Sequence, residues 1–400
     1  MIRTWSLPLA ASVALLLTGC SQAAVQPASL SPSAPQGPAA SASAWPMLGR
    51  DAQRTGRSDF VSAASGNVLW SVSLGQHMSS SPAIGPDGTV YVGGGDALWA
   101  LSPDGAVKWS AHQEGEIISS PAVAPDGTIY VGGVHANQQH RGGGFLAFAP
   151  DGSRLWRLAP DDWVQSSPAL APDGTIYFCC GSGKLYAVTP HGELKWTYDP
   201  GEKYQGSPQA IWLASPAIAP DGTIVYGTDT EGGPGVLRAV TPEGALLWTF
   251  VAGSGMNHAP AIGSDGTIYI CTNDDGRLRA ISPAGKELWA FAAHSAVQSS
   301  PAIGPDGTLY FSCDDGDLFA VSPQGHEVWK TGIGASETQP AIGADGTVYV
   351  LGDSLHAVSR AGKALWSTAP DDYSETSPAI GADGTLYVAG TSTLKAIGER

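Results

Sequence analysis

Charged residues, and basic ones above all, are scarce in this chain. Only 14% of its 400 residues are charged, and 20 Lys and Arg stand against 36 Asp and Glu, which gives a formal net charge of −16 at pH 7. Nucleic-acid binding needs a basic footprint, so this balance argues against a nucleic-acid partner. It fits a soluble surface that avoids anionic lipid headgroups.

The chain also lacks long apolar runs and helical periodicity. The apolar stretch from Leu7 to Leu17 is too short to cross a membrane as a mature helix. Beyond it, no window of helical length repeats its apolar residues every 3.6 positions. With 42% hydrophobic residues, the chain can still bury a core, which argues against global disorder.

The N-terminal segment is a targeting signal and not part of the fold. Arg3 precedes the apolar stretch, which ends on Leu17-Thr18-Gly19-Cys20 and resembles a bacterial lipobox. That resemblance implies a signal peptide over residues 1–19, cleavage before Cys20 and lipid on its sulfur. The alternative is an ordinary signal peptide with a chance cysteine.

Residues 20–44 continue as an uncharged tether rich in Ser, Ala and Pro, which cannot build a core. Ser21 stands where an Asp resembles an inner-membrane retention signal, so an extracytoplasmic, outer-membrane location is favoured if the organism has two membranes.

One phrase recurs from residue 80 onward: Ser-Pro-Ala, an Asp-Gly-Thr turn, then an apolar-Tyr-apolar strand. Eight copies are centred on a proline, and eight tryptophans close the repeats at intervals of 37 to 52 residues. This period is typical of four-stranded propeller blades. The prolines are Pro82, Pro121, Pro168, Pro216, Pro260, Pro301, Pro340 and Pro378. The tryptophans are Trp70, Trp109, Trp156, Trp196, Trp248, Trp289, Trp329 and Trp366.

The strand count predicts how the ring closes. We name the four expected strands of a repeat A to D. The last repeat, Ser377 to Gly398, has strands A to C, while the segment Val68 to Val72 reads as a lone strand D. Pairing the two hides the sheet edges. We therefore predict an all-β fold, an eight-bladed propeller over residues 45–400, made of four-stranded antiparallel blades and closed by its N-terminal strand.

These repeats resemble the pyrroloquinoline-quinone-like (PQQ-like) propeller family, as does the lead-in from Trp45 to Asp51 with Thr55-Gly56. Within that family, the lipoprotein architecture is most similar to BamB-type assembly factors of the outer membrane. The resemblance implies a monomeric, non-catalytic scaffold that binds envelope proteins and touches the membrane only through its lipid, without a cofactor. The alternatives are a quinoprotein dehydrogenase that binds PQQ and calcium, and a module that binds glycans or peptides.

Loop lengths predict a binding face. The A–B and C–D turns hardly vary in length, whereas the B–C and D–A loops on the other face do. Function often lies on such loops, although long insertions are also merely tolerated. The candidate residues of this face are His135, His140, Arg141, Trp163, Tyr204, Trp212, Asn257, His258, Tyr373 and Glu375.

Cys179 and Cys180 form the most unusual local motif. A vicinal cysteine pair also occurs beside the cofactor in quinoprotein alcohol dehydrogenases of this fold. A vicinal disulfide is one interpretation. Tight packing is the other, because small residues recur at the equivalent places and successive strand residues point to opposite faces. The acidic turns at Asn273–Gly276 and Asp314–Asp317 lack the full calcium loop, so we predict no metal site and no catalytic residue.

Overall fold

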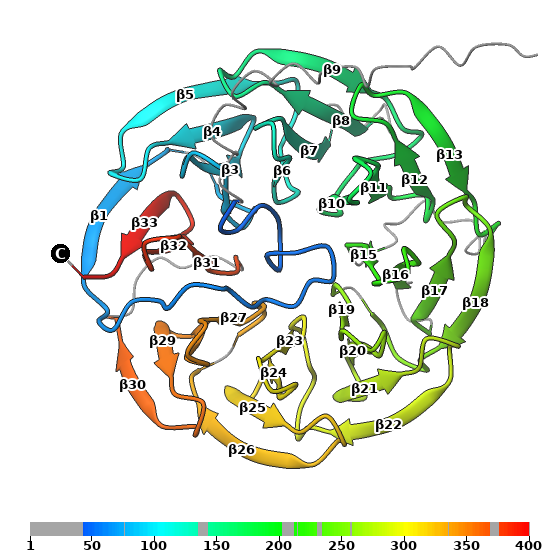
Figure 1. Ribbon diagram of the computed structural model, residues 1–400, viewed down its shortest axis with the longest axis vertical. Coiled ribbons are helices and arrows are strands. Elements are labelled where there is room, and N and C mark those ends of the chain that lie inside the picture. The colour runs from blue at the N-terminus through cyan, green and yellow to red at the C-terminus, as the bar shows by residue number, and fades with distance from the viewer. Residues whose placement is uncertain are drawn as a thin grey trace, which may run out of the picture. The chain divides into compact units, whose positions relative to one another are not determined.

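The computed structural model describes residues 43–399, apart from 76, 135–142, 202–211, 214, 230–233, 257, 335 and 369–375. Residues 40–400 form one compact unit. Its strands make eight separate sheets, arranged as blades around a ring (Figure 1). No helix in the described part has the length and apolar character that crossing a bilayer requires.

Each blade runs from a short inner strand A to an outer strand D. Blades 1 to 8 are β2–β5, β6–β9, β10–β13, β15–β18, β19–β22, β23–β26, β27–β30 and β31–β33 with β1. The A strands are β2 (Ala83–Ile84), β6 (Ala122–Val123), β10 (Ala169–Leu170), β15 (Ala217–Ile218), β19 (Ala261–Ile262), β23 (Ala302–Ile303), β27 (Ala341–Ile342) and β31 (Ala379–Ile380). The B strands are β3 (Val90–Gly94), β7 (Ile129–Val134), β11 (Ile176–Cys179), β16 (Ile224–Asp229), β20 (Ile268–Thr272), β24 (Leu309–Ser312), β28 (Val348–Leu351) and β32 (Leu386–Ala389).

The outer half of each blade is built in the same way. The C strands are β4 (Ala97–Leu101), β8 (Gly143–Phe148), β12 (Leu185–Val188), β17 (Val236–Val240), β21 (Arg277–Ile281), β25 (Asp317–Val321), β29 (Leu355–Val358) and β33 (Thr393–Ile397). The D strands are β5 (Val107–His112), β9 (Arg154–Leu158), β13 (Leu194–Tyr198), β18 (Leu246–Val251), β22 (Glu287–Ala292), β26 (Glu327–Gly332), β30 (Ala364–Ser367) and β1 (Val68–Ser73). Blade 4 carries one extra strand, β14 (Trp212–Leu213), paired with β16.

Burial explains the residue pattern of the blades. The B strands are almost wholly buried, whereas D strands such as β5 alternate between exposed and half-buried residues. Val, Ile and Tyr fill the B strands because both of their faces pack against neighbouring blades. The core therefore lies between blades and not within any single one.

The closing tryptophans join neighbouring blades. Trp70 Nε1 donates a hydrogen bond of 2.8 Å to the carbonyl of Pro103 in the next blade. Its ring lies against Gly105, which has φ +90°, and a Cβ there would come within 2.7 Å of the indole. The same bond recurs at every seam from Trp70 to Trp329. The repeat thus encodes both the turn and the joint.

The predicted closure is confirmed. β1 pairs with β33 in antiparallel register, and the last sheet has the order β1-β33-β32-β31. The N-terminal strand is therefore strand D of the eighth blade. At the adjoining seam Trp366 meets Gly66 instead of a C–D turn, and its Nε1 has no partner among the described residues.

Residues 43–63, which we call the strap, cross the centre of the ring as the dark blue trace of Figure 1. In six blades the last amide of strand A donates to a strap carbonyl at 2.7–2.9 Å. The donors are Ile84, Val123, Ile218, Ile262, Ile303 and Ile342, and the acceptors are Trp45, Pro46, Ala52, Gln53, Thr55 and Gly56. The strap therefore pairs with inner edges that a bare ring would leave open.

Candidate functional site

The strap does not run straight across the ring. Residues 47–56 turn inward, with a bond from Arg50 N to Met47 O and another from Gly56 N to Gly49 O, both 2.9 Å. Arg50 and Arg54 have φ of +70° and +60°, a conformation that costs non-glycine residues free energy. The surrounding bonds hold this turn in place.

Arg54 holds the loop to the blades. Its side chain is fully buried, and it donates to the carbonyls of Leu48, Ser167, Pro168 and Pro216 at 2.7–3.1 Å. Burial lowers the pKa of this guanidinium to about 9, while Asp51 opposes that shift. The group therefore stays charged at neutral pH, and carbonyl dipoles solvate it.

Because of this turn, the strap bypasses blade 3. The carbonyl of Pro46 accepts the strand A amide of blade 2, and the carbonyl of Ala52 accepts that of blade 4. In blade 3, between them, the amide of Leu170 has no acceptor among the described residues. Leu170 is half-buried. The amide of Ile380 in blade 8 also has no strap carbonyl, but Ile380 is fully buried in the core. Within the described part of the chain, blade 3 is thus the one blade whose last strand A residue has an amide unpaired with the strap and is only half-buried.

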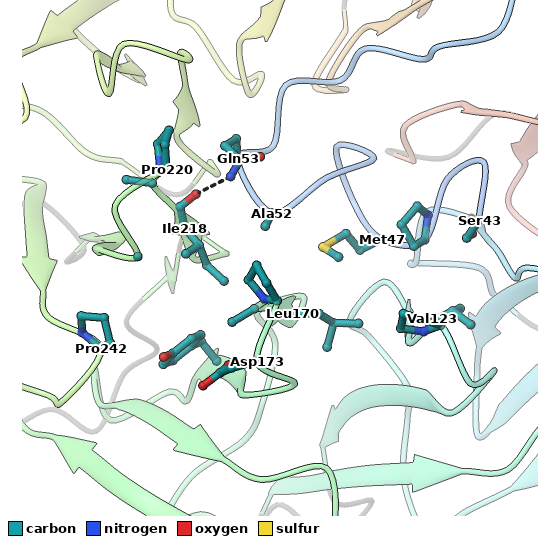
Figure 2. Close-up of a pocket in the computed structure, with 17 residues that line it drawn as sticks. Ser43, Met47, Ala52, Gln53, Val123, Leu170, Asp173, Ile218, Pro220 and Pro242 are labelled. Carbon is teal, nitrogen blue, oxygen red and sulfur yellow. Dashed lines mark hydrogen bonds between the residues drawn. The ribbon is translucent and has the colours of Figure 1, made fainter. Parts of the chain in front are cut away.

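A pocket of about 790 Å³ lies over this position. Figure 2 shows Leu170 in the middle of the lining residues, with Met47 and Ala52 of the strap beside it. The lining comes from the strap and from the strands and turns of blades 2, 3 and 4. It consists of Ser43, Pro46, Met47, Ala52, Gln53, Val123, Pro125, Leu170, Ala171, Pro172, Asp173, Tyr177, Ile218, Ala219, Pro220, Gly222 and Pro242.

The chemistry of the pocket is that of a docking site. Its walls are mainly Pro, Ala and branched aliphatic side chains, which favour apolar ligands. Burial raises the pKa of Tyr177 to about 12, so its phenol stays neutral. Asp173 at the rim is bonded to Thr175 and lies 3.5 Å from Lys195. None of these groups is an activated nucleophile or base.

A second, polar cavity of about 220 Å³ occupies the centre of the ring. It is lined by Leu48, Ser79, Ser81, Ile118, Ser120, Gln165, Ser167, Ser215, His258, Ala259, Ser300, Glu337, Gln339 and Ser377. Serines that precede the strand A proline bond from blade to blade: for example, Ser81 N donates to Ser120 Oγ at 2.9 Å. This chain of bonds ties the inner edges of the blades together.

His258 replaces a hydroxyl residue in this cavity. In blades 1, 3 and 6 the equivalent Ser80, Ser166 and Ser299 bond to strand B of their own blade. The buried Nε2 of His258 has no partner among the described residues. Desolvation lowers the pKa of His258 to about 4, so the imidazole is neutral at pH 7.

This burial predicts a loss of stability in acid. Between pH 6.5 and about 4 the unfolded chain binds a proton at His258 that the native chain excludes, so stability falls as the pH falls through this window. The loss amounts to about 3 kcal/mol at most. Urea unfolding at pH 7 and pH 4.5 measures it, and His258→Ser should remove much of the slope. An unchanged slope in the variant would refute this role.

Most residues of the predicted loop face cannot be placed. Seven of them, and the side chain of Trp212, lie outside the described residues. The seven are His135, His140, Arg141, Tyr204, Asn257, Tyr373 and Glu375. Of the two that are described, His258 lines the central cavity and Trp163 does not. Trp163 packs against Gly181, and its Nε1 is buried without a described partner.

Cys179 and Cys180 carry free, buried thiols in the structure, and the vicinal disulfide stays a prediction. The two residues pack in different core clusters, as strand alternation requires. Burial raises the pKa of both thiols. Neither cysteine lines the central cavity, so the pair does not fit a quinone site there.

The acidic turns bond within the protein. Asp275 accepts from Thr272 and Arg279 at 2.5 Å, and Asp317 accepts from Lys330 at 2.7 Å. In the parts of the chain that the structure covers, no group of three His, Cys, Asp or Glu side chains is placed to hold a metal ion.

The sequence profile of the family described as "Outer membrane protein assembly factor BamB" matches residues 56–210 and 314–398, which together exceed half of the chain. The chain belongs to the BamB family. No curated protein sequence matches it. The pocket at blade 3 is therefore a feature of a BamB-family propeller.

Solved structures confirm the fold at low sequence identity. BamB from Moraxella catarrhalis is 15% identical with a TM-score of 0.62, and the match covers 84% of this chain and 98% of that one. A europium-containing methanol dehydrogenase is 15% identical with a TM-score of 0.67 and coverage of 86% and 89%. Quinohemoprotein alcohol dehydrogenase from Comamonas testosteroni is 14% identical with a TM-score of 0.68 and coverage of 89% and 81%. Assembly factors and dehydrogenases share this propeller, so the likeness shows the fold alone.

Proposed function

We propose that this chain is a lipid-anchored protein of the cell envelope, attached at Cys20 and located at the outer membrane. It acts there as a non-catalytic scaffold in outer-membrane protein assembly and holds an extended segment of a partner protein in the blade 3 pocket. The observation that carries the proposal is the unpaired amide of Leu170 beneath an apolar pocket. Family membership and the lipobox-like segment support the location.

The neighbouring blades support an extended backbone as the ligand of blade 3. The equivalent amides of Val123 and Ile218 donate to an extended backbone, at 2.7 Å to the carbonyls of Pro46 and Ala52. An extended peptide laid over Leu170 supplies the same carbonyl, as in recognition by strand addition. The walls favour apolar side chains and proline, and a net charge of −16 disfavours an acidic segment.

Site-specific crosslinking tests this proposal. A photoreactive residue at Pro172, on the pocket rim, should capture an envelope protein in intact cells. The matched control is Pro305, which occupies the same exposed turn position in blade 6, where the strap is already paired. Equal capture at both positions, or none at Pro172, would count against the pocket.

Two further variants define the occupant. Filling the pocket with Ala171→Trp should abolish capture at Pro172 while the thermal unfolding temperature stays close to that of the parent. Deleting residues 21–42 should leave capture unchanged; if capture depends on them, or if the crosslink joins them to Pro172, the occupant is the tether and not a partner. Palmitate labelling that is lost in Cys20→Ala checks the anchor.

A further inference from the structure

The serines of the central cavity share an unused hydrogen-bond donor. Six blades place a serine at the position before the strand A proline, and each is more than nine-tenths buried. Each Oγ accepts one backbone amide from the preceding blade at 2.9–3.0 Å. None of the six hydroxyl protons has an acceptor among the described residues. The six are Ser81, Ser120, Ser167, Ser215, Ser300 and Ser377.

Two backbone amides also lack a hydrogen-bond acceptor. Blade 5 has Ala259 and blade 7 has Gln339 at the serine position, so each lacks the hydroxyl that should accept the preceding amide. The amides of Ser215 and Ser300 accordingly have no acceptor among the described residues. Buried amides are rarely left unpaired in native proteins. The cavity therefore gathers hydrogen-bond donors from both side chains and backbone.

The charged groups around the cavity also favour a negatively charged occupant. The guanidinium of Arg54 lies against the cavity wall, donating to Ser167 O at 2.8 Å, and its four bonds all go to carbonyls and not to a carboxylate. Opposing groups are few: the Asp51 carboxylate acts on the charge of Arg54, and the cavity lining adds three others. Glu337 is exposed at the lining and has a partner of its own, His258 is neutral, and Gln339 offers one unpaired Oε1.

We propose that the central cavity binds a small anion, such as a halide or a short carboxylate, on the serine hydroxyls and the free amides of Ser215 and Ser300. A volume of about 220 Å³ holds such an ion together with several water molecules. Many weak donors converging on one point bind anions without a dedicated cation at contact. This site is independent of the pocket at blade 3, and either can exist without the other.

Ion exchange at constant ionic strength tests the site. Sodium gluconate serves as the reference salt and is replaced stepwise by sodium bromide or formate while thermal unfolding is followed. We expect the unfolding temperature to rise by about 3 °C and to saturate, as for ligand binding to the native state. Crystals soaked in bromide should show one anomalous peak inside the serine ring.

Paired variants separate the site from general salt effects. Ser120→Ala with Ser167→Ala removes two cavity hydroxyls and should abolish the difference between bromide and gluconate. The control, Ser119→Ala with Ser166→Ala, removes the adjacent hydroxyls, which bond to Gly132 N and Cys179 N of strand B at 2.7 Å. It should lower the unfolding temperature but keep the difference. A bromide effect that survives in the first pair, or no anomalous peak, means that the cavity holds only water and overturns the proposal.

Discussion

Deletion of β1 should abolish cooperative folding of the propeller. Val68–Ser73 forms the outer strand of blade 8 and pairs along the whole of β33. Without it, β33 becomes an exposed edge, and the ring loses the seam in which Trp70 bonds to Pro103 and its ring packs against Tyr387. An open apolar edge favours aggregation. We expect no sharp unfolding transition and rapid proteolysis.

The matched deletion is residues 21–42, which precede the described residues. It should leave the unfolding temperature unchanged within about 1 °C, since uncharged Ser/Ala/Pro tethers contribute no core. Where the β1 deletion fails to express, Trp70→Ala gives a milder test, with a loss of about 3 to 5 kcal/mol. Equal protease resistance of the two deletions would refute the assigned role of β1.

Replacement of Arg54 should give the second large effect. Arg54→Ala removes the donor from four carbonyls and leaves a void between the strap and blades 3 and 4. We expect a loss of about 4 kcal/mol, measured by chemical denaturation. Arg54→Lys keeps the charge but not the planar fork, so it should recover only part of the loss.

Arg57→Ala is the control for this prediction. Arg57 belongs to the same strap, but among the described residues its side chain makes one hydrogen bond, of 3.2 Å, to Gly304 O. Its replacement should cost less than about 1 kcal/mol. If the two alanine variants were equally stable, Arg54 would not hold the strap in place.

The ring was predictable because the sequence motif of one blade occurs eight times. The tryptophans, the Asp-Gly turns and the Ser-Pro-Ala phrases each specify a local structure, and the missing strand of the eighth repeat indicates the partner of Val68–Val72. The strap was not predictable in this way. Its carbonyls pair with the blades through backbone atoms, which leave no residue signature, and Arg54 occurs once without a repeat for comparison.

The candidate site left only faint marks in the sequence. Leu170 stands where every other repeat has Ile or Val, yet this gives no hint that its amide is unpaired. The pocket also lies beside the A–B turns and not among the loops whose lengths vary. Ala259 and Gln339 interrupt a column of serines, but the column gains meaning only when each Oγ is seen to accept the amide of another blade.

The closure through β1 also has a kinetic consequence. The strand that completes the ring is near the start of the described chain, and its partner, Thr393–Ile397, is near the end. No pairing between them can form until the whole chain is available, and pairing over such a separation is slow. A chain that must remain unfolded during export would benefit from this order. The ring cannot close before the strands of its last blade are available.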